Sequence, residues 1–186
     1  MNNLFFEVVV IVLLLLTNGI FSMSEMAIIS ARKTRLQQLA ETGNRYARLT
    51  LKLVDDPNKF LATVQIGITL IGILSGAFGG TTLARTITAW LDTIPTLKPY
   101  SEAIGVAVVV IIITYLSLII GELVPKRLAL NSAERIAVVM AAPMNFLSML
   151  ASPLVKLLSL STNFVLRLLN IKPPAGPMIT QEEIEI

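Results

Sequence analysis

The chain has 186 residues, of which 54% are hydrophobic and 15% are charged, with a formal net charge of +3. Soluble domains carry roughly 25% charged residues, so this composition indicates a membrane protein, and the length fits one domain. The sequence contains neither His nor Cys. That excludes a disulfide framework, a structural zinc site and a Ser-His-Asp catalytic set, and we expect no enzyme activity.

Three long uncharged stretches are predicted to form transmembrane helices, because about 20 mostly apolar residues suffice for a helix to cross a bilayer. The first stretch runs on into Glu25 without a small-residue cleavage site, which is typical of a span and not of a signal peptide. The predicted spans cover about 4–29, 60–90 and 102–124.

Basic residues are unevenly distributed around these spans. Few lie near the second connection, where Arg85 and Lys98 stand. The first connection contains Arg32, Lys33, Arg35, Arg45, Arg48, Lys52 and Lys59, and the third span is followed by Lys126, Arg127 and Arg135. The positive-inside rule therefore predicts an integral protein of the plasma or inner membrane, with its N-terminus outside and its C-terminus in the cytoplasm.

A fourth apolar run, 136–155, is interrupted by Pro143 and Pro153. If this run crossed the membrane, Lys156, Arg167 and Lys172 would be exported, against the same rule. We therefore predict an in-plane or re-entrant helix here, within a juxtamembrane belt that covers about 133–171.

The basic connection 31–54 has apolar residues at helical spacing and is predicted to form an amphipathic helix pair broken at Gly43-Asn44. Asp56 is predicted to cap the second span, with Pro57 in its first helical position. The predicted fold is an all-α membrane protein with three transmembrane helices plus cytoplasmic juxtamembrane amphipathic and belt helices, in a transmembrane domain of residues 1–172. Residues 173–186 are predicted to be a linker towards a missing cytoplasmic domain.

Glu25 and Glu122 are the first candidate functional residues, because a carboxylate at the end of an apolar run is costly and is retained for function. Ser22 lies three residues before Glu25 and shares its helix face, whereas Ser24 joins them only if the backbone is distorted. Alternatively, Glu25 lies at the membrane interface and pairs with Arg32 or Lys33.

The second span contains Gly72, Gly76 and Gly80 at four-residue spacing, a pattern that favours close helix packing or a dimer contact over a ligand role. Ser75 lies inside this stripe, and its hydroxyl is a candidate ligand that could face the same centre as Ser22 and Glu25.

At the end of the third span, Pro125 cannot donate a hydrogen bond to the carbonyl of Gly121. That carbonyl and the Glu122 carboxylate together form a plausible pair of ion ligands. The alternative is a plain helix end in which Glu122 pairs with Lys126. Without imidazole or thiolate, the available ligands are oxygens, which suit hard cations, and we favour Mg2+ over Ca2+.

Several segments resemble the transmembrane domain of the CorC / cyclin M (CNNM) magnesium transporter family, over nearly the whole chain. The resemblance rests on residues 21–27 (FSMSEMA), 56–69 (DPNKFLATVQIGIT) and 121–126 (GELVPK). Met23 departs from the family, which often has a small residue there.

The resemblance implies export of Mg2+ driven by Na+ influx. It also implies a homodimer with three transmembrane helices and a belt helix per subunit, followed by a cytoplasmic CBS-pair domain that binds nucleotide; this segment itself would hold none. The family's ion-site segments match Ser22, Ser24, Glu25, Ser75, Gly121 and Glu122.

Two functions follow as hypotheses. The first is a secondary transporter that moves Mg2+ outward against Na+. The second is a membrane-anchored Mg2+ sensor or scaffold without transport of its own, and a pore is a weaker third.

Overall fold

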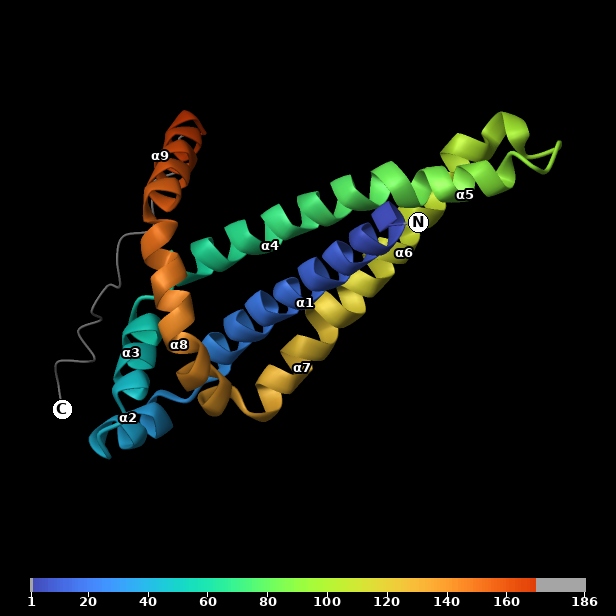
Figure 1. The fold of residues 1–186 in the computed structure, drawn as a ribbon. Helices are drawn as coiled ribbons and strands as arrows, with labels where there is room; N and C mark the ends of the chain where they lie inside the picture. The colour runs from blue at the N-terminus through green and yellow to red at the C-terminus, as the bar shows by residue number, and fades with distance from the viewer. Residues whose placement is uncertain (1, 170–186) are drawn as a thin grey trace. The chain divides into compact units, whose positions relative to one another are not determined.

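The computed structural model describes residues 2–169, without the side chains of residues 2, 3, 81 and 82, and all regular structure in that range is helical (Figure 1). The all-α prediction is therefore confirmed. The chain divides into two compact units, Met1–Leu150 and Ala151–Ile186, and the second is described only as far as residue 169.

The first unit begins with the long helix α1 (Asn2–Ser30) and the short helices α2 (Lys33–Glu41) and α3 (Arg45–Asp55). The next long helix consists of α4 (Asn58–Phe78), a π-helical turn η1 (Gly79–Leu83) and α5 (Ala84–Leu91). A 3-10 turn η2 (Lys98–Tyr100) leads into α6 (Ser101–Leu118), a second π-helical turn η3 (Ile119–Leu123) and α7 (Val124–Asn131). The unit ends with α8 (Ala133–Leu150), and α9 (Ser152–Leu168) lies in the second unit.

Within the described residues, four segments are long and apolar enough to cross a membrane. They are Leu4–Ser30, Asn58–Phe78, Lys98–Asn131 and Ala133–Leu150. The first three contain or overlap the predicted spans, and the third extends beyond the predicted end at 124. The fourth is α8, which length and composition also allow as a span; its place in the membrane plane stays a prediction.

The break between α2 and α3 lies where the sequence predicts it. Gly43 has a φ of 91°, a left-handed conformation that glycine adopts without a steric penalty. The Oδ1 atom of Asn44 then caps α3 by accepting hydrogen bonds from the backbone N–H groups of Tyr46 and Ala47, at 3.0 and 3.1 Å.

The predicted start of the second span was wrong in detail. Pro57 itself is the N-cap of α4, which begins at Asn58, and no side chain caps this helix. Asp56 instead ends α3, with φ −130° and ψ 80°. The N–H of Leu61 bonds to the Pro57 carbonyl at 2.8 Å, so the helix begins one residue later than a capping Asp56 would require.

The prolines interrupt the helices less than the sequence suggests. α8 continues through Pro143 as one helix and ends at Leu150. Pro153 lies in the first turn of α9, where a missing N–H costs no helical hydrogen bond.

The buried core of the first unit lies at the end where α1, α3, α4, α7 and α8 meet (Figure 1). It consists of Ala27, Ile28, Leu53, Phe60, Val64, Ala129, Ala137, Ala141 and Met144. Much of the remaining surface is apolar: on α6, Val110, Ile111 and Ile112 are all exposed. Such a continuous apolar exterior suits hydrocarbon better than water. α1 packs against α4 and also against η3 and α7, and its Asn18, Ser22 and Ser24 are buried.

Candidate ion site where α1 meets the second π-helical turn

Gly121 and Glu122 lie inside η3, the π-helical turn that joins α6 to α7. A π-helical turn inserts a wider loop of backbone into a helix and is frequent at functional sites. The plain helix end that the alternative places around Glu122 and Lys126 does not occur, because the helix runs on through Pro125 to Asn131. The Gly121 carbonyl, to which Pro125 cannot donate, accepts a hydrogen bond from Asn18 Nδ2 at 3.2 Å.

Asn18 is the residue of this site that the sequence analysis missed. Its side chain is 7% exposed, and its Oδ1 atom is buried with no hydrogen-bond partner in the described part of the chain. Leaving such an oxygen unpaired costs about 1–3 kcal/mol in folding free energy, so the atom is a candidate for binding a ligand. One signal was available, since Asn18 lies four residues before Ser22 and a helix places such a pair on one face.

Ser22 continues the polar face of α1 that Asn18 begins. The residue is 1% exposed, and its Oγ atom is likewise buried without a hydrogen-bond partner among the described residues. Asn18 and Ser22 thus place two unpaired oxygens one helical turn apart inside the protein, and the Gly121 carbonyl is bonded to Asn18. Oxygen atoms of this kind are the ligands that hard cations prefer.

Two glycines permit the close approach of α1 and η3. A Cβ atom on Gly121 would lie 2.8 Å from Asn18 Nδ2, and one on Gly19 would lie 3.0 Å from the Ile120 carbonyl oxygen. Larger residues at either position would push the helices apart.

Ser24 is fully buried, but its hydroxyl donates to the carbonyl of Ile20 at 2.7 Å. α1 is a regular helix from Asn2 to Ser30, so Ser22 and Ser24 do not share a face here. The backbone irregularity that the sequence analysis considered for this segment occurs in η1 and η3 instead. As an ion ligand, Ser24 stays a prediction.

The two carboxylates converge on one ammonium group. Lys126 Nζ lies 2.8 Å from Glu122 Oε1 and 4.0 Å from Glu25 Oε2. The i,i+4 pair that the alternative reading of Glu122 predicts is therefore present. The alternative partners of Glu25 are engaged elsewhere: Arg32 lies 3.9 Å from Glu134, and Lys33 lies 2.7 Å from Asp55.

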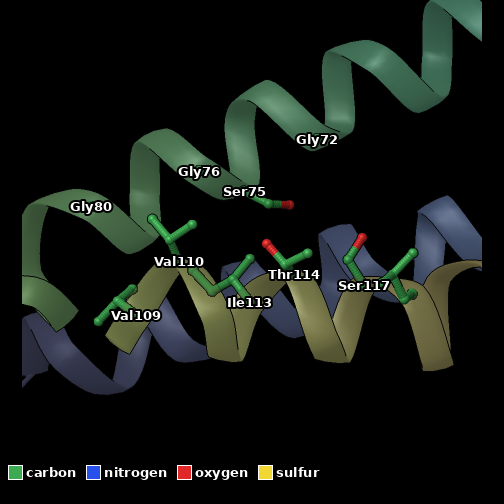
Figure 2. Close-up of a pocket in the computed structure, with 10 residues that line it drawn as sticks. Gly72, Ser75, Gly76, Gly80, Val109, Val110, Ile113, Thr114 and Ser117 are labelled. Carbon is green, nitrogen blue, oxygen red and sulfur yellow. The ribbon is translucent and has the colours of Figure 1, made fainter. Parts of the chain in front are cut away.

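Ser75 lies on α4, 3% exposed, and its Oγ atom is buried without a hydrogen-bond partner in the described chain. It lines a pocket of about 260 Å3 between α4 and α6. In Figure 2 the hydroxyl of Ser75 points into this pocket, as do those of Thr114 and Ser117 on α6. Ser117 precedes Gly121 by about one turn, so the pocket lies just before η3 along the helix.

The glycine stripe borders the same pocket. Gly72, Gly76 and Gly80 line it, and a Cβ atom built on any of them would meet nothing within 4 Å (Figure 2). Among the described residues, no neighbouring helix therefore approaches these three positions closely enough to need glycine there.

Apart from Ser24, the candidate residues thus fall into three groups. Asn18 and Gly121 are hydrogen-bonded, with Ser22 on the same face of α1. Glu25 and Glu122 share Lys126, while Ser75 faces the pocket beside α6. No cluster of three or more acidic side chains that could hold a metal occurs in the described residues, so any ion bound here needs hydroxyl, amide and carbonyl oxygens as well.

Long apolar helices that enclose buried, unpaired oxygens define an integral membrane domain with a polar centre. The chain belongs to the family of the cyclin M transmembrane N-terminal domain, whose family model matches residues 9–186. The resemblance seen in the sequence is therefore confirmed.

Relatives cover most of this chain. It is 54% identical to the UPF0053 protein sll0260 of Synechocystis sp., over 99% of this chain and 40% of that protein. It is 30% identical to the polyamine export protein of Haemophilus influenzae, over 98% of this chain and 42% of that protein. It is 32% identical to the UPF0053 inner membrane protein YfjD of Escherichia coli, over 82% of this chain and 32% of that protein. The chain thus spans less than half the length of each of these relatives.

Proposed function

We propose that this chain is the ion-translocating membrane domain of a secondary transporter that exports Mg2+ in exchange for Na+ influx. Mg2+ binds between the three spans in one conformation and is released outward in another. Secondary transporters often place such sites beside broken or irregular helices near the middle of the membrane. η3 supplies the irregular backbone in this proposal.

The observation that carries the proposal is the pair of buried, unpartnered oxygens on Asn18 and Ser22, of which Asn18 also bonds to the Gly121 carbonyl. Mg2+ takes six oxygen ligands and commonly keeps several waters. An amide oxygen, a hydroxyl and a backbone carbonyl supply part of that shell without a carboxylate cluster. The proposed ligand set is Ser22, Ser24, Glu25, Ser75, Gly121 and Glu122, to which we add Asn18.

The carboxylates of Glu25 and Glu122 supply the negative charge in this proposal. Their contact with Lys126 means that an arriving divalent ion competes with an ammonium that is already present. Na+ is the proposed coupling ion, and no nucleotide is required in this segment.

The proposal extends to assembly and topology. The open glycine stripe along α4 supports a homodimer in which a second copy covers the pocket at Ser75. The N-terminus is proposed to lie outside and the C-terminus in the cytoplasm. The transmembrane domain is residues 1–172, with a juxtamembrane belt at about 133–171 and a linker at 173–186. The linker and the end of the belt lie outside the described residues.

A second candidate function is export of a polyamine, the activity in the name of the Haemophilus influenzae relative. The Lys126 ammonium between Glu25 and Glu122 is the observation that favours it, because an alkylammonium group already occupies the space between the two carboxylates. A polyamine would present the same chemical group.

Reconstitution in liposomes tests both functions. We expect Mg2+ to leave a Mg2+-loaded compartment when Na+ is supplied from the other side, and Glu122→Gln to abolish this flux. Glu102→Gln is the matched control, because it removes the same charge from an exposed position at the start of α6. Putrescine flux measured in the same vesicles decides between the two substrates.

Each outcome has one interpretation. Mg2+ flux that survives Glu122→Gln means that the site assignment is wrong. Flux of putrescine without Mg2+ favours the second candidate. Mg2+ binding without any flux favours the membrane-anchored sensor or scaffold, and conduction that neither saturates nor depends on Na+ favours a pore.

A further inference from the structure

A second polar pocket, of about 500 Å3, lies away from the ion site. It is bordered by α2, by the start of α3 and by the segment where α7 gives way to α8. α1 ends just before α2 and α7 ends at Asn131, so the pocket lies at the ends of two candidate spans, on the side rich in Lys and Arg.

The charge around this pocket is mainly positive. Arg35 of α2 and Arg135 of α8 line it, both are exposed, and neither has an acidic partner in the described part of the chain. Among the described residues, Glu134 is the one acidic side chain in the lining, and it already faces Arg32, 3.9 Å away. An anion in the pocket would therefore meet two available guanidinium groups.

The other polar side chains of the pocket can also donate hydrogen bonds. Asn44 uses its Oδ1 atom to accept from two N–H groups of α3, which leaves its Nδ2 group as a donor. Asn131 and Ser132 add an amide and a hydroxyl. Two guanidinium groups with neutral donors around them match the oxygens of a phosphate group.

An apolar surface leads away from the pocket along α8. Val139 lies in the pocket lining and is 62% exposed, and Phe146 and Leu150 are 62% and 69% exposed. These residues are seven and four positions apart, so they fall on one face of the helix. The stretch from Val139 to Leu150 rises about 17 Å along the helix axis.

We propose that this pocket binds the headgroup phosphate of an acidic phospholipid, whose acyl chains cover the exposed apolar face of α8. A cationic pocket joined to an apolar face is the complement of a lipid, whereas a soluble phosphate would use only the pocket. Basic pockets at the cytoplasmic ends of transmembrane helices bind anionic headgroups in this way. The cytoplasmic location rests on the proposed orientation; the lipid site does not depend on ion transport.

Native mass spectrometry of the purified 186-residue chain tests this proposal. Dioleoyl phosphatidylglycerol is the probe, and dioleoyl phosphatidylcholine has the same acyl chains without the net charge. We expect the anionic lipid to be retained about tenfold better, and the double variant Arg35→Gln with Arg135→Gln to lose that preference, because hydrogen bonds to charged groups are worth about tenfold or more in affinity. Arg48→Gln, which removes an exposed arginine of α3 outside the pocket, should leave the preference unchanged.

A rescue variant separates charge from folding. Arg35→Lys with Arg135→Lys keeps both positive charges, and we expect it to regain part of the preference for phosphatidylglycerol. If the lysine variant is as defective as the glutamine variant, or if the glutamine variant still prefers phosphatidylglycerol, the arginines do not bind the headgroup.

Other occupants have their own outcomes. Displacement of bound phosphatidylglycerol by millimolar inorganic phosphate would assign the pocket to a soluble anion and overturn the lipid proposal. If phosphatidylglycerol binds only after Glu182, Glu183 and Glu185 are changed to Gln, the pocket would be assigned to that acidic segment of the chain and not to a lipid. Equal retention of the two lipids by the unmodified chain would also overturn it.

Discussion

Asn18 connects α1 to η3 through one hydrogen bond to the Gly121 carbonyl, and it leaves its own Oδ1 atom unpaired. The Nδ2 group and the Oδ1 atom of this amide therefore have different proposed roles. The Nδ2 group holds the carbonyl of η3 in place, and the Oδ1 atom is available to an ion. Ser22 adds a hydroxyl on the same helix face.

Asn18→Ala tests this division. The variant loses one proposed ligand and the bond that positions another, so we expect the dissociation constant for Mg2+ to rise about tenfold or more and the free energy of unfolding to fall by about 1–2 kcal/mol. Calorimetric titration measures the first effect and thermal unfolding in detergent measures the second. Thr17→Ala is the control, because that hydroxyl is exposed and bonds only within α1. A loss of stability with unchanged Mg2+ affinity would make Asn18 purely structural.

Lys126 is the counter-ion of the proposed site. With its ammonium 2.8 Å from Glu122 and 4.0 Å from Glu25, it partly neutralises the charge that would attract a divalent cation. We expect Lys126→Gln to tighten Mg2+ binding, on the order of tenfold, because a competing positive charge a few ångströms away is removed.

The control for Lys126→Gln is Arg127→Gln, which removes a neighbouring exposed charge that has no ion pair in the described chain. If both variants change the affinity for Mg2+ equally, the effect comes from the overall electrostatic field of the protein surface and not from Lys126 in particular. Weaker Mg2+ binding in Lys126→Gln alone would show that the ammonium supports the site.

At the scale of elements, contact between helices decides which glycines tolerate a side chain. A Cβ atom on Gly67 of α4 would lie 2.7 Å from the ring of Phe21 on α1, whereas one on Gly72 would meet nothing within 4 Å. The two positions lie on the same helix and differ in what surrounds them.

We expect Gly67→Ala to destabilise the protein by about 1–3 kcal/mol, because the extra carbon overpacks the contact of α1 with α4. Gly72→Ala should leave the unfolding temperature unchanged or slightly higher, because alanine favours helix. Thermal unfolding of the two purified variants in the same detergent provides the comparison. Equal stability of both variants would mean that α1 and α4 are not in contact at Phe21.

The sequence could predict the elements whose cause is local. Apolar length indicated the long helices, and Gly43 with Asn44 indicated the break between α2 and α3. The π-helical turns η1 and η3 were not predicted, because no single residue type marks such a turn. The continuation of α8 through Pro143 was not predicted either; Ala141 and Met144, on either side of the proline, are both buried.

The candidate site shows the same limit. Ser22, Ser75, Glu25 and Glu122 stood out by residue type within apolar runs. Asn18 was missed because its place in the site depends on its hydrogen bond to Gly121, which lies 103 residues away in the sequence. The ion-pair partner of Glu25 was also not predicted. Local spacing suggested Arg32 or Lys33, whereas the fold brings Lys126 close to Glu25.

At the scale of the whole molecule, the open glycine stripe on α4 is the surface that we assign to a second copy of the chain. We expect Gly72→Leu and Gly76→Leu to convert the proposed dimer into monomer, because leucine fills the space at which the backbones would meet. Light scattering coupled to size-exclusion chromatography measures the mass of the protein in detergent. Ile73→Phe enlarges an exposed residue of α4 that does not line the pocket, and it should remain dimeric.

Titration of the purified protein with Mg2+ by calorimetry, with and without excess Na+ and in the variant Glu122→Gln, tests the central claim most directly. We predict saturable Mg2+ binding that Na+ weakens and that Glu122→Gln abolishes, while Glu102→Gln binds as before. Mg2+ binding that is indifferent to both Na+ and Glu122 would contradict the account, because the ion would then be held elsewhere in the protein and the polar centre between α1 and η3 would need another explanation.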